Sequence, residues 1–422
     1  MTELSRQLSK INKEYGASGS AATARMQPSL IWSAQEASHK SLDDVFNVGR
    51  NGFLGLVGLD KGFQEYEEAL FGADHVGTDR QLLSKDDNLQ LDADLARFLR
   101  LLCSYLLHPA AVKALEWLMR RFRVHELNVD AVVSCALPYH ETNLFVKIVQ
   151  CLRLRPPSSS STALAKQHTY SQWQWLEPMK KTGLPLPRAL IVERCLRAPE
   201  LFLAIATQAR DAVREGSHCR PLIALYTSTA VGVLCARDAA PQEALVNQLL
   251  PFLFDSLEQS LSTEYQLSAH LIVAQLARRV ELQPRLAASL SRHLVDSLRA
   301  HSSSHALTRS ALLTLLALAQ HQPLLRFSRK ALRHLLAVPE LFAVLSDASV
   351  AQAYSLEALV NVLVLALSSH LPIPDSLPPL LQIVTQLPLS RANVLLIVKK
   401  LFSRISSHDD NSEDNDDEKG KQ

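Results

Sequence analysis

The chain has 422 residues, of which 47% are hydrophobic and 20% are charged, and its formal net charge at pH 7 is +2. This length allows a large buried core, and the near-neutral charge excludes a protein that is basic throughout. The charge is unevenly distributed, because residues 408–422 contain seven Asp or Glu and two Lys, a net charge of −5, which leaves +7 on the rest. A mildly basic body with an acidic tail is compatible with contact to RNA or to acidic proteins.

The six cysteines form no CxxC pair and have no histidine partners at zinc-site spacing, so we expect reduced thiols, no metal and no cofactor. The N-terminal residues MTELSRQLSK contain no apolar signal-peptide core. The most apolar runs, Ala311–Ala319 and Ala358–Leu367, are too short to span a bilayer. These features predict a soluble intracellular protein that does not enter membranes.

The first 80 residues have a mixed texture. Residues 1–28 are polar and predict a flexible segment with one short helix. Ser41, followed by Asp43 and Asp44, is typical of a helix start. Glycines at positions 49, 52, 55, 58 and 62 predict short broken pieces after it, explained by helix breaks or by close packing rather than by a nucleotide-binding loop.

Helical periodicity becomes clear from about residue 90. Leu91, Leu95, Phe98, Leu102 and Tyr105 share one face of a predicted helix. Pro109 predicts the first turn of the next helix, where its missing N–H costs nothing. A third element over 129–137 is stopped by Pro138, and a fourth starts at Glu141 or Thr142.

Residues 156–162 (PPSSSST) are of low complexity and predict a surface loop. Trp117 lies beside an apolar stripe and is expected in the core. One of Trp173 and Trp175 is expected to fill a groove between helices, next to a rigid connector that contains Pro185 and Pro187.

Residues 189–405 read as one helix after another. The helix over 265–280 is predicted to pair with 284–300, and 305–320 with 326–337, at a step of about 40 residues, typical of HEAT and armadillo units. Helices over 350–368 and 392–405 follow, with a proline-rich connector at 372–379 between them. The predicted fold is an all-α HEAT/armadillo-like solenoid of antiparallel helix pairs, with a disordered acidic tail at 406–422.

A basic cluster lies at the end of the second clear helix. It consists of Arg120, Arg121 and Arg123, and Lys113, Lys147, Arg153 and Arg155 could extend it. These arginines either cap the carbonyl end of their helix or bind phosphates or an acidic partner. The absence of interleaved aromatic residues for base stacking favours capping.

His125, His140 and Glu141 are the candidates for a metal or acid–base site. No third or fourth converging ligand is visible in the sequence, so turn residues that hydrogen-bond to helix ends are the simpler interpretation. Motifs of serine hydrolases, P-loop proteins and zinc proteases are absent from the sequence. We therefore expect no enzymatic activity and no small-molecule substrate.

Four blocks of sequence resemble the family of HEAT-repeat-containing protein one, the animal counterpart of U3 small-nucleolar-RNA-associated protein ten. They are ALEWLMRRFRVHELN (114–128), CALPYHETNLFVKIVQCL (135–152), WQWLEPMKKTGLPLPRALI (173–191) and VFNVGRNGFLGLVGLDKGFQEYEEALF (45–71). The resemblance covers the family's N-terminal region. It is specific over residues 29–210, whereas residues 211–405 match only in texture. The predicted subdivision is therefore 1–28, 29–210, 211–405 and 406–422.

The resemblance implies a non-enzymatic nucleolar scaffold of the small-subunit processome. Such a scaffold supports processing of pre-18S rRNA and transcription of ribosomal DNA by RNA polymerase I. The implied partners are WD40-type processome subunits, and U3 small nucleolar RNA or pre-rRNA, bound directly or indirectly. The candidate contact surface comprises Arg120, Arg121, Arg123, Pro138, Tyr139, His140, Glu141 and Lys147.

Two other hypotheses stay open at this stage. The chain could be a generic helical-repeat adaptor for transport or for the cytoskeleton, which periodicity alone does not distinguish from the first hypothesis. It could also be a helical hydrolase that uses His140 and Glu141. Loss of turnover on replacing both residues with Ala would support that view.

Overall fold

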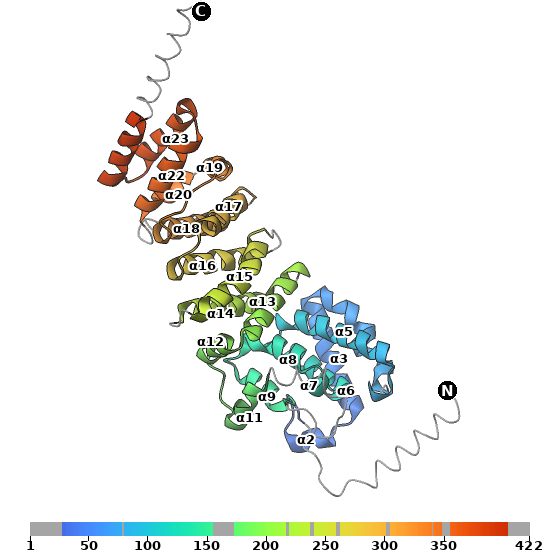
Figure 1. Ribbon diagram of the computed structural model, residues 1–422. Coiled ribbons are helices and arrows are strands. Elements are labelled where there is room, and N and C mark those ends of the chain that lie inside the picture. Colours follow the sequence, from blue (N-terminus) through green and yellow to red (C-terminus); the bar gives the residue numbers. More distant parts are fainter. Residues whose placement is uncertain are drawn as a thin grey trace, which may run out of the picture. The chain divides into compact units, whose positions relative to one another are not determined.

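The computed structural model describes residues 28–77, 80–154, 173–216, 219–236, 240–258, 262–300, 304–339, 341–347 and 355–403. These ranges contain helices and turns and no strand. The chain forms two compact units, one up to Leu186 and one from Pro187 onward (Figure 1). The predicted all-α class and solenoid-like packing of helices are confirmed.

Several predictions concern residues outside the described ranges. The flexible segment 1–28, apart from its last residue, and the loop at 156–162 are among them, as is the acidic tail at 406–422. The predicted subdivision at residue 210 follows the extent of the resemblance, and this position lies inside a helix over 199–214. It stays a prediction.

Unit 1 is built from α-helices joined by short 3₁₀ turns. The helices are α2 (Ala34–His39), α3 (Leu42–Leu59), α4 (Glu67–Phe71), α5 (Lys85–Cys103), α6 (Pro109–Phe122), α7 (Val124–Leu127), α8 (Val129–Ala136), α9 (Asn143–Cys151) and α11 (Glu177–Thr182). The 3₁₀ turns are η1 (Lys61–Tyr66), η2 (Ala73–Val76), η3 (Arg80–Leu82), η4 (Leu137–Tyr139) and η5 (Gln174–Leu176).

Helix starts in unit 1 follow local sequence chemistry. The side chain of Ser41 accepts a hydrogen bond from the backbone N–H of Asp44 at 3.1 Å, which caps α3 as predicted. Thr142 caps α9 in the same way through the N–H of Phe145 at 3.3 Å. Pro109 occupies the first turn of α6, also as predicted.

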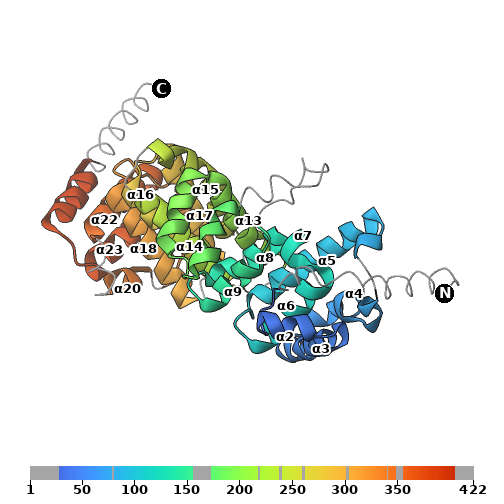
Figure 2. The same ribbon diagram turned by 90° about the horizontal axis from the view of Figure 1, so that it is seen from below.

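The glycine-rich segment forms one continuous helix, so the prediction of short broken pieces was wrong. Helix α3 runs for 18 residues through Gly49, Gly52, Gly55 and Gly58. A Cβ atom on Gly52 would lie 2.6 Å from the carbonyl oxygen of Ala110 in α6. The glycines therefore let α3 lie directly against α6 (Figure 2), and the alternative of close packing is the correct one.

An aromatic cluster fills the centre of unit 1. The rings of Phe53 and Phe71 stack with centroids 4.4 Å apart, and Phe98 lies 5.4 Å from Phe71. Trp117 is fully buried, as predicted, and its indole N–H donates to the carbonyl oxygen of Leu70 at 2.9 Å. The buried indole thus has its polar atom satisfied and ties α6 to the end of α4.

Unit 2 contains longer helices that follow one another in chain order, from green to red in Figure 1. They are α12 (Arg188–Arg197), α13 (Pro199–Arg214), α14 (Arg220–Cys235), α15 (Ala240–Glu258), α16 (Thr263–Arg279), α17 (Pro284–Ala300), α18 (His305–His321), α19 (Arg329–Leu336), α20 (Leu341–Ser346), α22 (Leu356–His370) and α23 (Ile373–Gln386). Residues 391–403 form a further helix.

Two layers of helices run through unit 2. Helices α14, α16, α18 and α22 pack one upon the next, and so do α13, α15, α17 and, against α17, α19. Across the layers, α13 packs on α14, α15 on α16 and α17 on α18. Equivalent helices begin at residues 220, 263 and 305, a spacing of about 40 residues that is expected for HEAT-type units.

The predicted helices 265–280, 284–300 and 305–320 are present, but their pairing was shifted by one helix. Helix α16 pairs with α15 rather than with α17, and α18 pairs with α17 rather than with α19. The apolar stripes predict that each helix packs on neighbours. They do not distinguish a loop that joins the two helices of one pair from a loop that joins one pair to the next, because both kinds of loop are short in this unit.

The proline-rich segment 372–379 is not a connector, which corrects another prediction. Only Leu371 and Pro372 separate α22 from α23. Pro374 lies in the first turn of α23, and Pro378 and Pro379 lie inside the helix. Proline at the first turn is compatible with a helix, so the segment begins a new helix instead of bridging two others.

Polar side chains tie successive pairs of unit 2 together. Gln322 is 3% exposed and donates to the carbonyl oxygens of Ala277 and Val280, while it accepts from the N–H of Leu282 at 2.9 Å. His370, at the end of α22, bonds through Nε2 to the carbonyl oxygen of Phe327 at 3.0 Å. These bonds satisfy backbone groups at helix ends that would otherwise be unpaired.

A candidate partner-binding site

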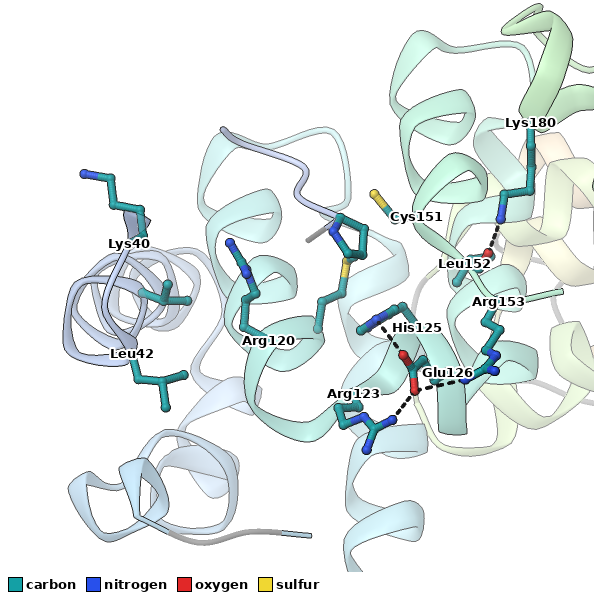
Figure 3. A pocket seen from close by; sticks show the side chains of 13 residues that line it. Lys40, Leu42, Arg120, Arg123, His125, Glu126, Cys151, Leu152, Arg153 and Lys180 are labelled. Atoms are coloured by element: carbon teal, nitrogen blue, oxygen red, sulfur yellow. Dashed lines mark hydrogen bonds and ion pairs between the residues drawn. The ribbon is translucent and has the colours of Figure 1, made fainter. Parts of the chain in front are cut away.

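The predicted basic cluster lies where α6 ends and the chain reverses. Arg123 follows the last residue of α6 with a left-handed backbone, φ 51° and ψ 39°. This conformation is uncommon for a residue other than glycine or asparagine. It redirects the chain into the short helix α7, which brings His125 and Glu126 next to Arg123 (Figure 3).

Arg120 points into an interior network. Its guanidinium pairs with the carboxylate of Glu116 at 3.2 Å and donates to the carbonyl oxygen of Ala37 at 2.8 Å. Glu116 is fully buried and also accepts from the N–H of Leu30 at 2.7 Å. This network ties α6 to α2 and to the segment before α2. The Arg120 side chain is 10% exposed, at the inner wall of a cavity.

The other two arginines of the cluster are placed differently. Arg121 is half-buried. Arg123 is 40% exposed and pairs with Glu126, whose carboxylate also lies 3.7 Å from Arg153. Glu126 is therefore shared by two guanidinium groups, with the Nε2 atom of His125 at 3.6 Å as a third neighbour.

The carbonyl end of α6 is capped by a residue from another part of the chain. Arg80 is 7% exposed and donates to the carbonyl oxygen of Phe122 at 2.9 Å and to the side chain of Asn128 at 2.7 Å. It also pairs with Asp92 in α5. The sequence assigned this role to the arginines of α6 itself, since no local signal connects Arg80 with a helix end that is 42 residues further along the chain.

The predicted surface at 138–141 splits into buried and exposed parts. The hydroxyl of Tyr139 donates to the carbonyl oxygen of Cys103 at 2.6 Å. His140 is 4% exposed, and its Nδ1 lies 2.6 Å from the carbonyl oxygen of Leu186, which as an acceptor requires the proton on Nδ1. Pro138 is half-buried in η4, and Glu141 is exposed.

The remaining predicted residues do not join one site. Lys147 is exposed on α9, and Lys113 donates to the side chain of Asn51 at 3.4 Å. Arg155 lies outside the described residues. Trp173 is 2% exposed and its indole N–H donates to Asp130, which is consistent with the expectation that one of the two tryptophans fills an inter-helix space.

A cavity of about 710 Å³ opens beside Arg120 and Arg123. Five cationic side chains line it, and Glu126 is the one carboxylate among its lining residues (Figure 3). The cations are Lys40, Arg120, Arg123, Arg153 and Lys180. The rest of the lining is largely apolar and includes Pro28, Leu42, Val45, Met119, Cys151 and Leu152.

The cavity collects side chains from distant parts of unit 1. Lys40 precedes α3, and Lys180 comes from α11, where it donates to the carbonyl oxygen of Leu152 at the end of α9. The sequence alone predicted one basic cluster that contains Arg120 and Arg123 and that Arg153 could extend. Lys40 and Lys180 were missed, because only the fold places them beside that segment.

Burial controls the ionisation of two groups in the cavity wall. Burial lowers the pKa of His125 from its ordinary 6.5, an effect that the neighbouring Glu126 carboxylate opposes. Burial likewise raises the pKa of the Cys151 thiol to about 11, with a smaller contribution from Glu116 in the same direction. At neutral pH the imidazole is therefore biased toward its neutral form, and the thiol is protonated and unreactive.

The described residues include no group of three or more His, Cys, Asp or Glu side chains arranged to hold a metal ion. In the same ranges, no helix has the length and apolar character needed to cross a membrane. The residues that line the cavity make it a basic and partly apolar recess.

Comparison with known proteins identifies the family. Residues 245–367, in unit 2, match the family model of U3 small nucleolar RNA-associated protein 10. HEAT repeat-containing protein 1 of Homo sapiens is 29% identical over 328 residues, which is 76% of this chain. U3 small nucleolar RNA-associated protein 10 of Neurospora crassa is 28% identical over 384 residues, or 88% of this chain. A HEAT repeat-containing protein 1 homolog of Drosophila melanogaster is 32% identical over 310 residues, or 72% of this chain. The chain belongs to this family.

The chain aligns with only a small share of the length of each of these relatives. An uncharacterised protein of Arabidopsis thaliana is 32% identical over 312 residues, 72% of this chain. The aligned parts cover 13% of the Arabidopsis protein, 14% of the human protein and 20% of the Neurospora protein. The expectation that residues 211–405 match only in texture was wrong, since the family model matches within that range.

Proposed function

We propose that the chain is a non-enzymatic scaffold in ribosome biogenesis, acting with the U3 small nucleolar ribonucleoprotein in the nucleolus. The match of residues 245–367 to U3 small nucleolar RNA-associated protein 10 carries the proposal. In its finer form, the scaffold belongs to the small-subunit processome. There it supports pre-18S rRNA processing and RNA polymerase I transcription, and it contacts WD40-type subunits and U3 or pre-ribosomal RNA.

The architecture of unit 2 supports a binding role. Stacked helix pairs present long, nearly regular surfaces to other molecules, and proteins of this design act by holding partners. In unit 1, the predicted acid–base pair of the hydrolase hypothesis is separated by burial. His140 is buried against a backbone carbonyl, whereas Glu141 is exposed. This arrangement favours a structural role for His140.

Affinity purification of the tagged full chain from cells tests the scaffold function. We expect recovery of U3 small nucleolar RNA and of processome subunits, and a nucleolar signal for the tagged chain by microscopy. A spliceosomal small nuclear RNA and the tag alone serve as controls for non-specific capture. Recovery of neither U3 RNA nor processome subunits, together with exclusion from the nucleus, would reject the proposal in favour of a generic adaptor.

A further inference from the structure

The cavity in unit 1 carries an excess of positive charge that its own lining does not neutralise. Arg120 is neutralised by Glu116 behind the wall. Four other cationic side chains line the cavity with one carboxylate, Glu126, which already has Arg123, Arg153 and His125 as neighbours. Lys40 is exposed at the rim, and its ammonium group lies 5.8 Å from the ring centroid of Trp32. Such a concentration of one charge in a recess attracts an anionic partner.

The chain segments that adjoin the cavity do not supply the missing negative charge. Residues 1–27 lead directly into Pro28 in the cavity wall, and they contain four basic and two acidic residues. Residues 155–172 follow shortly after Arg153, and they contain two basic residues and no acidic one. Both segments add to the positive charge. The acidic tail at 408–422 has no aliphatic side chain to cover Leu42, so complementarity points to another molecule.

The apolar part of the lining narrows the chemistry of that partner. Leu42 is 45% exposed beside the cations, and Pro28 and Cys151 are half-buried, whereas Val45, Met119 and Leu152 are at most 2% exposed and form the closed floor of the cavity. No Phe, Tyr or Trp is among the residues that line the cavity, and the imidazole of His125 is only 12% exposed, whereas single-stranded nucleic acid is usually held by stacking of bases on aromatic side chains. Phosphates alone would leave the exposed side chain of Leu42 without a partner.

We propose that this cavity binds an acidic protein segment in which aliphatic side chains alternate with Asp or Glu. The carboxylates pair with the cations of the rim, and the aliphatic side chains cover Leu42 and Pro28, which removes apolar surface from water. The proposal rests on the scaffold function, because it names a class of partner for that scaffold. Peptide binding is measured with the purified chain, outside any nucleolar complex. The binding proposal and the scaffold proposal can therefore be rejected independently.

Fluorescence anisotropy with the purified full chain tests the proposal. The probe is a labelled peptide in which Asp and Glu alternate with Leu. The comparison probes are the same peptide with Ser in place of Leu, and an oligouridylate that carries the same number of negative charges. We expect the Leu-containing peptide to bind about tenfold or more tightly than either comparison probe.

Paired variants separate the cavity from general surface charge. Lys40→Glu/Arg153→Glu reverses two exposed charges of the rim and should weaken binding of the Leu-containing peptide by about tenfold or more. Lys61→Glu/Lys85→Glu makes the same change in net charge at exposed positions outside the cavity. At physiological ionic strength, the affinity of this variant for the Leu-containing peptide should stay within about twofold of the unchanged chain.

A second pair of variants, Leu42→Ser and Leu82→Ser, tests the contribution of the apolar side chain in the cavity to peptide binding. Leu42→Ser should weaken binding of the Leu-containing peptide several-fold and leave binding of the Ser-containing peptide unchanged. Leu82→Ser, at a position that is 84% exposed and outside the cavity, should change binding of neither peptide. Binding of oligouridylate as tightly as the peptide, with the same dependence on Lys40 and Arg153, would overturn the proposal in favour of a nucleic-acid site. Absence of binding by every probe, or equal effects of the control variants, would also overturn it.

Discussion

At the scale of single residues, the arginines of α6 show how one cluster can serve two purposes. Arg120 is committed to the buried carboxylate of Glu116 and to a backbone carbonyl of α2, so it holds the wall of the cavity in place. Arg123, one turn of the chain later, keeps 40% of its side chain exposed. Substitutions at the two positions should therefore have different consequences, one mainly for folding and the other mainly for binding.

Arg120→Met should lower the free energy of unfolding by about 3 kcal/mol or more, because it leaves Glu116 as a buried charge without its partner. The double variant Glu116→Met/Arg120→Met should recover part of this loss, since neither charge is then buried alone. Urea unfolding followed by circular dichroism measures both. Strictly additive losses in the double variant would mean that the two side chains do not interact.

His125 should make the stability of unit 1 sensitive to acid. Burial lowers its pKa in the folded state below the ordinary 6.5, although Glu126 opposes the shift and Arg120 and Arg123 add to it. Between the two pKa values the unfolded chain binds more protons, so the contribution is complete above about pH 6.5 and is lost as the pH falls toward the folded-state value. His125→Gln should flatten the fall in unfolding free energy over this range, as measured by urea titrations at a series of pH values; parallel curves would contradict the prediction.

At the scale of elements, the α3–α6 contact depends on the absence of side chains at Gly49, which faces Trp117, and at Gly52, which faces Ala110. Gly52→Ala should lower the free energy of unfolding by about 2 kcal/mol, because the added Cβ meets the backbone of Ala110 and outweighs the better helix propensity of alanine. Gly58→Ala in the same helix is the matched control. Nothing lies within 4 Å of its Cβ position, so there we expect a gain of about 0.5–1 kcal/mol. Thermal unfolding of both variants distinguishes these outcomes, and a gain at both positions would refute the packing argument.

Periodicity and capping residues predicted most helices correctly, since these are local signals. Ser41, Pro109 and Thr142 act where the sequence placed them, as does the apolar face that begins at Leu91. Glycine was misread because its low helix propensity is also local, whereas the benefit of close packing against α6 is a tertiary effect. The shifted pairing in unit 2 has a similar cause. The helices there have apolar faces that could each pack on more than one neighbour, and tertiary packing of the whole unit determines which helices pair.

The candidate site was predictable only in part, for the same physical reason. Arg120 and Arg123 are close in sequence and Arg153 follows 30 residues later, so a basic cluster was visible. Lys40 and Lys180 join them only after folding. The inward orientation of Arg120 was not visible either, because it depends on Glu116 and on a backbone carbonyl 83 residues away.

At the scale of the whole molecule, the two compact units differ in what they contain. Unit 2 contains the residues that match the family model, and it has the repeating architecture of the fold. Unit 1 contains the basic cavity. The purification experiment and the peptide experiment therefore examine separate properties of the chain.

The layered arrangement of unit 2 also has a consequence for stability. Extensive contacts are made between helices that are next to each other in the two layers, and ties such as that of Gln322 reach only to the adjoining pair. The stability of such an array is close to a sum over neighbouring helix pairs and their interfaces. Damage to one helix pair is therefore expected to stay near that pair.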